Sequence, residues 1–410
     1  MAPTDNPLIF LSAGEASGEH YAVGLIHAIR RQRPAAQFFG LGGGRMVALG
    51  FRPIVRAEDV AHMGITEVVR HAPFIYRQFQ RLKAAIRAER PALAILIDFP
   101  DVNLRLAAHL HRLGVPVVYF VSPQLWAWKK RRIRRVRRYV DRMLVIFPFE
   151  ELFYRERGVA AEFVGHPMAD LAPPVITRHE FARQHGLDES KPWVALLPGS
   201  RAHEVHLNLP AMLQAAAALG SAYQYILPVA PTLGREAVAA AIASSPAAPR
   251  LVDDARAALL HARAAIVASG TATVEAALIG NPFIVVYRLS RLSYAIARRV
   301  VTVPHVAMAN LIAGRRLVPE LIQDDFTPAN IVAALQPLLA EGEQRAQVMT
   351  GLGQLRKRLQ CAHAPGCTAI ERTAGICLDM LLKDHAPGSR GVHPGKGPQA
   401  VAQAAGTHQA

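Results

Sequence analysis

The sequence is poor in cysteine, and the few cysteines present are not arranged for cross-linking. Its 410 residues include three cysteines, Cys361, Cys367 and Cys377, all late in the chain. An odd number without paired spacing argues against a disulfide framework and indicates a reducing compartment. A zinc site that combines them with His363 is disfavoured, because no second ligand pair has the usual spacing. We therefore expect free thiols at these positions.

Long hydrophobic runs are also missing. No stretch of about 18 uncharged apolar residues occurs, which argues against a membrane-spanning helix. The most apolar candidate, residues 264–286, is interrupted by Glu275 and by Asn281-Pro282. Residues 1–6 lack the basic region of a signal peptide, and the apolar run 8–12 is too short for its hydrophobic core. We expect a chain that does not span a membrane but remains able to lie on one.

Acidic residues are outnumbered by basic ones, 31 to 47, so the formal net charge is +16. Such a charge points to an anionic partner: nucleic acid, a membrane surface or a phosphorylated substrate. Charge alone does not choose among the three. Aromatic residues make up only 7% of the chain, but the apolar residues fall into short regular blocks, which does not suggest disorder.

Apolar strand patterns alternate with helical patterns in both halves of the chain. The predicted strands are 8–12, 92–97, 115–121 and 142–147 in the first half, and 194–197, 225–229, 264–268 and 283–287 in the second. Helical spacing is clearest over about 21–31 and 104–113. Buried strands separated by helices predict parallel sheets with right-handed crossovers. The fold class is therefore α/β, with two Rossmann-like domains facing a central cleft, where ligands usually bind.

The domain boundaries follow from where this alternation stops and restarts. We expect a first domain over 1–171 and a second over 172–345, joined by a polar, proline-containing linker at about 172–191. The helices of 346–384 are expected to pack back on the first domain. The tail, 385–410, is rich in Gly, Pro, Ala, His and Gln, and is predicted to be disordered.

Three segments of the first half are candidates for chemistry. Residues 12–19, SAGEASGE, follow the first strand, and their glycines allow tight turning, but they form neither a Walker A loop nor a dinucleotide fingerprint. The glycine loop 40–44 follows another strand; taken alone, each glycine loop is more often turn chemistry than a site. Asp98 ends the strand 92–97, where a partly apolar setting would raise the pKa of a general base. Asp101 is interpreted as a helix cap.

The segment 121–128 contains two of the three tryptophans. Core packing explains one tryptophan, and two beside Ser122 at a strand end suggest a pocket wall. The following run, 129–138, has eight basic residues in ten, with apolar residues at helical spacing. A solvated face of a core helix and attraction to anionic lipid explain this run equally well. Nucleic-acid binding is less favoured, because no aromatic residues interleave the basic ones.

Two strand ends of the second half have the character of anion sites. Gly199 and Ser200 would direct backbone N–H groups toward an anion, and Arg201 offers a fork of donors for phosphate. Small residues at 269–271 open a helix and suit a diphosphate. Glu275, one turn later, would accept hydrogen bonds from ribose, although serine and threonine at a helix start are also ordinary caps.

These blocks, taken in order, resemble the lipid-A-disaccharide synthase family. The matching segments are SAGEASGE, FGLGGGRM, MGITEVV, LIDFPDVNLRL, YFVSPQLWAWKKRRI, FPFE, FVGHP, LLPGSRAHEV, ASGTATVEAAL and VPELIQ. They cover roughly residues 8–335, and ten segments in register are far more specific than one. One departure is visible: the family usually has Leu-Pro-Asn where this chain has Met308-Ala309-Asn310.

The resemblance implies an inverting, GT-B-type glycosyltransferase of lipid A biosynthesis. UDP-2,3-diacylglucosamine and 2,3-diacylglucosamine 1-phosphate (lipid X) would give a β-1,6-linked disaccharide 1-phosphate and UDP, on the cytoplasmic face of the bacterial inner membrane. Asp98 and Arg201 would be catalytic, although the sequence leaves open whether Asp98, Asp101 or Glu15 is the base. No Asp-x-Asp motif is present, so we expect no metal and no cofactor.

The resemblance also implies the remaining site residues. The UDP-sugar site would contain Gly199, Ser200, Arg201, Ser269, Gly270, Thr271, Glu275, Asn310, Glu320 and Gln323. The loops on the acceptor side would contribute Gly14, Glu15, Ser17, Gly18, Ser122 and Trp126. The isolated polar residues near 310 and 320 are, each alone, as readily explained as buried structural groups.

The segment 62–86 mixes aromatic and basic residues and is slightly favoured as a membrane contact over a core-facing helix pair. Its contact residues would be Phe74, Arg77, Phe79, Arg81 and Leu82. Two alternatives stay open: another UDP-sugar enzyme, such as an epimerase or a different lipid-linked glycosyltransferase, and more remotely a basic RNA-binding protein. Whether the chain forms a homodimer is also open.

Overall fold

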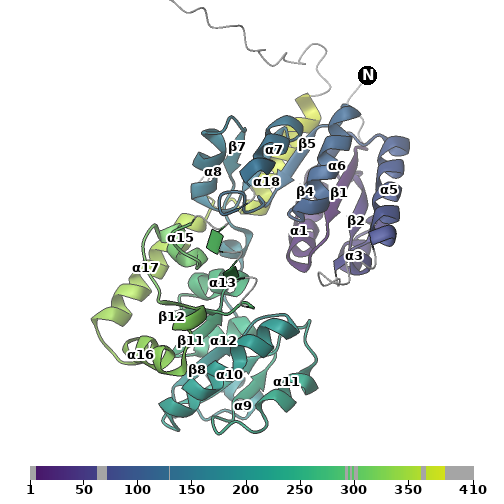
Figure 1. Ribbon diagram of the computed structural model, residues 1–410. Helices are drawn as coiled ribbons and strands as arrows, with labels where there is room; N and C mark the ends of the chain where they lie inside the picture. Colours follow the sequence, from purple (N-terminus) through teal and green to yellow (C-terminus); the bar gives the residue numbers. More distant parts are fainter. Residues whose placement is uncertain are drawn as a thin grey trace, which may run out of the picture.

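The computed structural model describes residues 6–61, 72–128, 130–290, 294–295, 298–299, 303–361 and 366–383. The predicted disordered tail lies outside these residues. Two parallel β-sheets form two lobes, each with helices on its faces (Figure 1). The prediction of an α/β fold with two Rossmann-like domains is confirmed.

Within the described residues the first sheet has seven strands in the order β3-β2-β1-β4-β5-β6-β7, with every neighbouring pair parallel. Its strands are β1 Leu8–Ala13, β2 Gln37–Gly42, β3 Arg52–Arg56, β4 Leu93–Ile97, β5 Val117–Phe120, β6 Arg142–Val145 and β7 Ala161–Phe163. Its helices are α1 Ala16–Gln32, α2 Gly44–Val47, α3 Glu58–Ala61, α5 Ala72–Glu89, α6 Pro100–Arg112, α7 Ile133–Tyr139 and α8 Pro148–Arg155.

The second sheet is also parallel, in the order β10-β9-β8-β11-β12-β13. Its strands are β8 Trp193–Leu197, β9 Gln224–Pro228, β10 Arg250–Val252, β11 Ala264–Ala268, β12 Phe283–Tyr287 and β13 Glu320–Ile322. Its helices are α9 Arg178–His185, α10 Ala202–Leu219, α11 Arg235–Ile242, α12 Ala255–His261, α13 Thr271–Ile279, α15 Met308–Ala313, α16 Pro328–Leu339 and α17 Glu343–Leu359; α18, Ala369–Lys383, ends the described chain.

Apolar strand residues form the core because helices cover both faces of each sheet. Every residue of β4, β8 and β11 is buried, which is why these strands stand out as unbroken apolar runs in the sequence. Strands at the sheet edges, such as β3, carry exposed arginines and escaped prediction.

Three local predictions are corrected. The glycine loop 40–44 is partly strand, since β2 continues through Gly42. The proposed linker 172–191 contains the helix α9, which Thr177 and Glu180 cap reciprocally. Asp101 is not a helix cap, because α6 begins at Pro100 with Phe99 in the cap position, and Asp101 forms an ion pair with Arg132.

The chain crosses between the two lobes twice, and the crossing segments touch. His166 N–H donates to the carbonyl of Leu359 at 2.7 Å, and a side chain at Gly165 would collide with the backbone of Cys361. Helix α17 packs on α13, α15 and α16 of the second lobe, whereas α18 packs on α1 of the first (Figure 1). Of the helices expected to return to the first domain, therefore, only α18 does so.

Candidate functional site

Both candidate sites lie where the strand order of a sheet reverses. In the first sheet the reversal falls between β1 and β4, and in the second it falls between β8 and β11. Loops diverge at such a point beyond the carboxyl ends of the strands, which leaves a crevice that ligands occupy in α/β folds. Asp98 follows β4, and the segments 199–201 and 269–271 follow β8 and β11.

Asp98 has an unusual backbone conformation and a carboxyl group with a raised pKa. Asp98 and Phe99 both have φ 46°, in the left-handed region that non-glycine residues rarely adopt. Burial, and secondly the negative charge of Glu15, raise the pKa of Asp98 to about 7, against a smaller lowering by the backbone N–H of Phe99. A carboxylate with a pKa near neutrality suits a general base.

Gly14 makes room for this arrangement. A Cβ atom at Gly14 would lie 2.5 Å from the Phe99 ring, so a larger residue would displace the ring. Of the other predicted acceptor-side residues, Glu15 and Ser17 are exposed at the start of α1 and Gly18 is buried. The structure thus brings the β1 loop and Asp98 together.

Tyr21 links the two candidate sites. Burial, then the Asp98 carboxylate and then the Glu275 carboxylate, raise the pKa of Tyr21 to about 12. One phenol therefore lies within the electrostatic range of a carboxyl group from each lobe.

Ser122 and Trp126 face inward rather than into an open pocket. The Ser122 hydroxyl bonds to Tyr154 Oη at 2.8 Å, and Trp126 Nε1–H donates to Glu150 Oε1 at 3.0 Å. Burial raises the pKa of Glu150 to about 7, opposed by the hydrogen bonds it accepts. These residues shape the 121–128 loop from beneath, and Trp128 is the tryptophan of this loop with exposed surface.

The segment 199–201 forms the expected set of anion donors, and a side chain of the protein occupies them. Glu204 Oε2 accepts from the backbone N–H groups of Ser200 at 3.0 Å and Arg201 at 3.3 Å. Glu204 Oε1 accepts from the Arg201 guanidinium at 3.1 Å. Glu204 was not among the predicted site residues, and its position on these donors appears only in the structure.

The second donor segment is open. Gly270 has φ 152°, a conformation that glycine tolerates, and both Gly270 and Thr271 are exposed at the start of α13. Ser269 N–H continues the sheet by donating to Val286 O at 2.9 Å. The N–H groups of the first turn of α13 therefore face the same sheet edge as those of 199–201.

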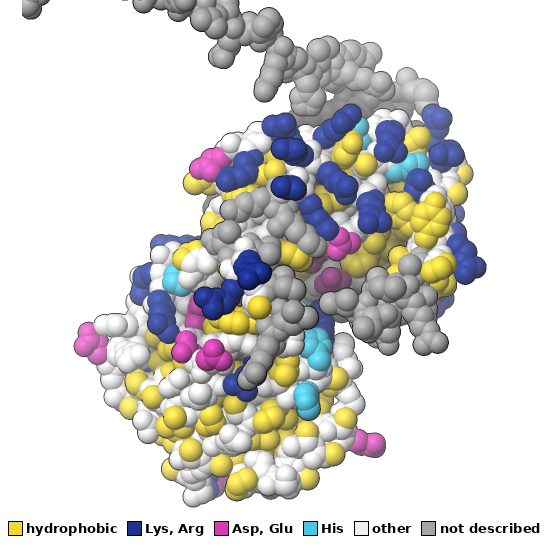
Figure 2. Space-filling view, in the orientation of Figure 1, with side chains coloured by type: hydrophobic (Ala, Val, Ile, Leu, Met, Phe, Trp, Pro, Cys, Tyr) yellow, Lys and Arg dark blue, Asp and Glu magenta, His cyan; other side chains and the backbone are white. Residues whose placement is uncertain are grey.

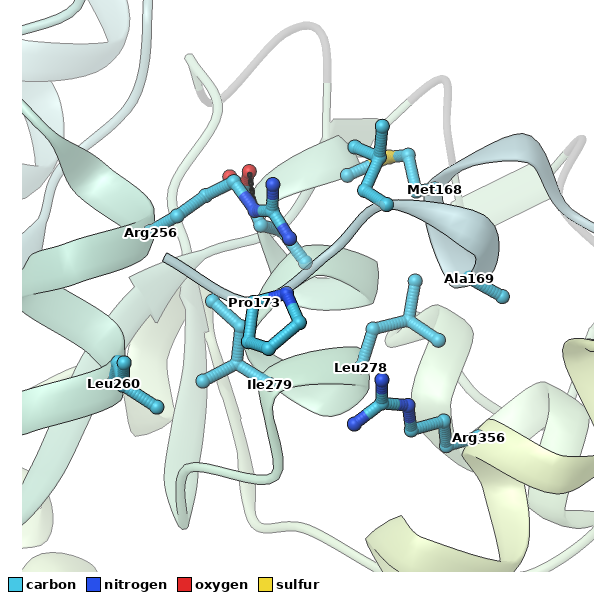
Figure 3. Close-up of a pocket in the computed structure, with 10 residues that line it drawn as sticks. Met168, Ala169, Pro173, Arg256, Leu260, Leu278, Ile279 and Arg356 are labelled. Atoms are coloured by element: carbon cyan, nitrogen blue, oxygen red, sulfur yellow. Dashed lines mark ion pairs between the residues drawn. The ribbon is translucent and has the colours of Figure 1, made fainter. Parts of the chain in front are cut away.

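Glu275 lines a small pocket beside the first crossing segment. Met168, Leu171, Pro173, Arg256 and Arg356 line it with Glu275, and Arg256 and Arg356 approach it from opposite sides (Figure 3). Arg256 Nε lies 3.8 Å from Glu275 Oε1, and the same guanidinium donates to Ala172 O at 2.9 Å. Burial raises the pKa of Glu275, while Arg256 opposes the shift.

Asn310, Glu320 and Gln323 use their polar atoms within the protein. Asn310 is fully buried and bonds to the backbone of 317–318 and to Glu320. Gln323 both donates to and accepts from the backbone of Leu289 at 2.8 Å. In this geometry Asn310 has no surface to offer a ligand, which corrects its assignment to the pocket lining. All three side chains fix the loops around the second sheet.

The predicted membrane segment lies partly outside the described residues, which resume at 72. On α5, Arg77 and Arg81 are exposed and Phe74 and Phe79 are half-buried. Leu82 is 1% exposed and belongs to the core, so the prediction of membrane contact is wrong for this residue. Among the helices of the described residues, none combines the length and apolarity needed to cross a bilayer.

Similar structures define the class of this fold. The calicheamicin glycosyltransferase CalG4 superposes with a TM-score of 0.57 at 17% identity, covering 93% of this chain and 100% of CalG4. The UDP-GlcNAc 2-epimerase from Neisseria meningitidis, solved with UDP-GlcNAc, gives 0.54 at 11% identity, covering 92% and 99%. The architecture is that of the GT-B glycosyltransferases and the related epimerases.

Sequence comparison is more specific. Residues 9–367 match the family described as lipid-A-disaccharide synthetase. The lipid-A-disaccharide synthase of Acidobacterium capsulatum is 64% identical over 391 residues, covering 92% of this chain and 97% of the relative. That of Koribacter versatilis is 50% identical over 378 residues, covering 92% and 99%. The chain belongs to the lipid-A-disaccharide synthase family.

Proposed function

We propose that this chain transfers the diacylglucosamine of UDP-2,3-diacylglucosamine to the 6-hydroxyl of 2,3-diacylglucosamine 1-phosphate. The observation that carries the proposal is the place of the Asp98 carboxyl group, directly after β4 at the reversal point of the first sheet, where burial raises its pKa to about 7. Family membership supplies the substrates, and the position of Asp98 supplies the base.

In the proposed step the acceptor oxygen attacks the anomeric carbon from the face opposite UDP. Asp98 takes the hydroxyl proton, the bond between the anomeric carbon and the diphosphate oxygen breaks, and the electron pair leaves with UDP. Arg201 and the N–H groups at 269–271 stabilise the charge on the leaving diphosphate. Glu275 holds ribose. No metal takes part in this scheme.

The enzyme meets its acylated substrates at a membrane. Lys and Arg side chains gather on the visible face of the first lobe (Figure 2), and Arg134, Arg135, Arg137 and Arg138 on α7 are exposed. Beneath them Val136 is fully buried, so α7 is anchored in the core while its charged side remains available. We assign this face to the anionic cytoplasmic surface of the inner membrane.

The test uses the purified full chain with both substrates in detergent and EDTA. Equal amounts of disaccharide and UDP are expected, with the product lost in Asp98→Ala and retained in Asp101→Asn. UDP release without acceptor would point instead to a hydrolase or to an epimerase that hydrolyses its UDP-sugar. Restoration of an EDTA-inactivated enzyme by Mg²⁺ would overturn the metal-free scheme.

A further inference from the structure

The carbonyl of Asp98 is held by two buried side chains from different elements. Asn103 Nδ2 donates to Asp98 O at 2.8 Å and to Ile97 O at 3.1 Å. Tyr119 Oη, from β5, donates to the same Asp98 carbonyl at 2.6 Å. Asn103 is 0% exposed and Tyr119 is 0% exposed, so neither donor has water as an alternative partner.

The asparagine is itself held in orientation. Ser12 Oγ, on β1, donates to Asn103 Oδ1 at 2.6 Å, and Ser12 is also 0% exposed. Because the oxygen of the amide accepts this bond, its NH₂ group must face the carbonyls. One asparagine on α6 therefore ties together the ends of β1 and β4, on either side of the reversal point.

The backbone at this position needs such restraint. Asp98 and Phe99 are consecutive residues with φ 46°. Each such conformation costs of order 1–3 kcal/mol and persists only where the surroundings over-determine it. Rotation of the peptide between residues 98 and 99 would break the hydrogen bonds from Asn103 and Tyr119 to the Asp98 carbonyl. The loss of each bond would leave a buried donor without a partner. These bonds fix the direction in which the Asp98 carboxyl leaves the strand.

We propose that Asn103 is a positioning residue for glycosyl transfer, which together with Tyr119 locks the Asp98 peptide so that its carboxylate meets the acceptor hydroxyl. The inference rests on the proposed function, in which Asp98 is the base. It adds that the rate depends on the orientation of the Asp98 peptide, which Asn103 on α6 and Tyr119 on β5 hold in place. A misplacement of about 1 Å at a reacting group costs on the order of 10²-fold.

The test compares Asn103→Ala and Tyr119→Phe with the wild-type chain in the same assay. We expect kcat to fall about 10²-fold in Asn103→Ala and about 10-fold in Tyr119→Phe, with KM for the UDP-sugar within about twofold, since the donor lobe is untouched. The acid limb of the kcat–pH profile moves as well, because the surroundings of the Asp98 carboxyl change.

Asn281→Ala is the matched control. Asn281 is 5% exposed and donates to the Leu259 and Ala262 carbonyls at 2.8 Å, so it is an equally structural asparagine in the other lobe. It should lose stability while keeping kcat and the pH profile.

Unchanged kcat and pH profile in folded Asn103→Ala and Tyr119→Phe would overturn the inference. If Asn103→Ala does not fold, Tyr119→Phe decides, because it keeps the ring and removes only the hydroxyl. Failure of the proposed function is distinct: then the wild-type chain makes no disaccharide, or Asp98→Ala remains active.

Discussion

Glu204 accepts hydrogen bonds from both the backbone N–H and the guanidinium of Arg201, at 3.3 and 3.1 Å. These are the donors that a diphosphate would need, so the protein's own carboxylate competes with UDP for them. The Arg201 side chain is 69% exposed and that of Glu204 is 14% exposed. Solvent therefore screens the guanidinium side of the pair, where UDP would displace the carboxylate.

Removing this charge should tighten nucleotide binding. Glu204→Gln keeps an acceptor for the helix start but frees the guanidinium, and we expect the Kd for UDP to fall about two- to fivefold by calorimetry. Glu180→Gln, in the equivalent capping box of α9, should leave the Kd unchanged. Equal effects of the two variants would show that the loss of one negative charge, wherever it lies, changes the Kd. Weaker UDP binding in Glu204→Gln alone would show that Glu204 supports the site.

The raised pKa of Asp98 sets the acid limb of the activity. Below pH about 7 the carboxyl is protonated and cannot accept the hydroxyl proton, so kcat/KM should fall tenfold per pH unit. Because the negative charge of Glu15 contributes to the raised pKa, Glu15→Gln should move the limb to lower pH. Asp101→Asn should leave it in place, and loss of activity in that variant would transfer the role of base to Asp101.

Glu150 should make the stability of the protein depend on pH. Burial raises its pKa from 4.5 to about 7, so the folded chain keeps a proton that the unfolded chain releases. The resulting stabilisation is complete below pH 4.5 and is lost as the pH rises to about 7, which amounts to roughly 3 kcal/mol. The free energy of unfolding of Glu150→Gln, measured in urea, should therefore lack this decrease between pH 4.5 and about 7.

The control for this measurement is Glu156→Gln, because Glu156 is an exposed glutamate at the end of the same helix. This variant should retain the wild-type dependence of unfolding free energy on pH. Parallel pH dependences for the wild-type chain and Glu150→Gln would mean that Glu150 is charged in the folded protein.

Membrane attachment should depend on the outer face of α5. Tyr76 is 63% exposed, and Arg77 and Arg81 are exposed on the same helix. Each basic residue near an anionic surface contributes about 1 kcal/mol, so Arg77→Ser/Arg81→Ser should reduce flotation with phosphatidylglycerol vesicles about 30-fold. Tyr76→Ser should weaken it further.

The matched control for flotation is Arg183→Ser/Arg250→Ser, which removes the same charge from exposed positions of the second lobe. It should leave vesicle binding close to wild type. Equal losses in both double variants would indicate that net charge, rather than one face of the first lobe, attracts the membrane.

The sequence by itself determined the α/β fold, the buried strands and the family. Unbroken apolar runs at β4, β8 and β11 reflect strands that helices cover on both sides. Ten motifs in the same order as in the family identified the family by themselves. The sequence also located the strand ends that precede Asp98, Arg201 and Thr271, because small and polar residues after a buried strand are a local pattern.

Tertiary structure decided which polar side chains are available to ligands. Asn310 and Trp126 have site-like neighbours in the sequence, yet hydrogen bonds to the segment 317–320 and to Glu150 turn them inward. Asn103 gained importance for a related reason, because it bonds to a strand residue 91 positions away. Glu204 differs, since its partners are Ser200 and Arg201, four and three residues before it in a capping box. Hydrogen-bond partners and burial depend on which segments the fold brings together, and residue type and spacing do not encode that.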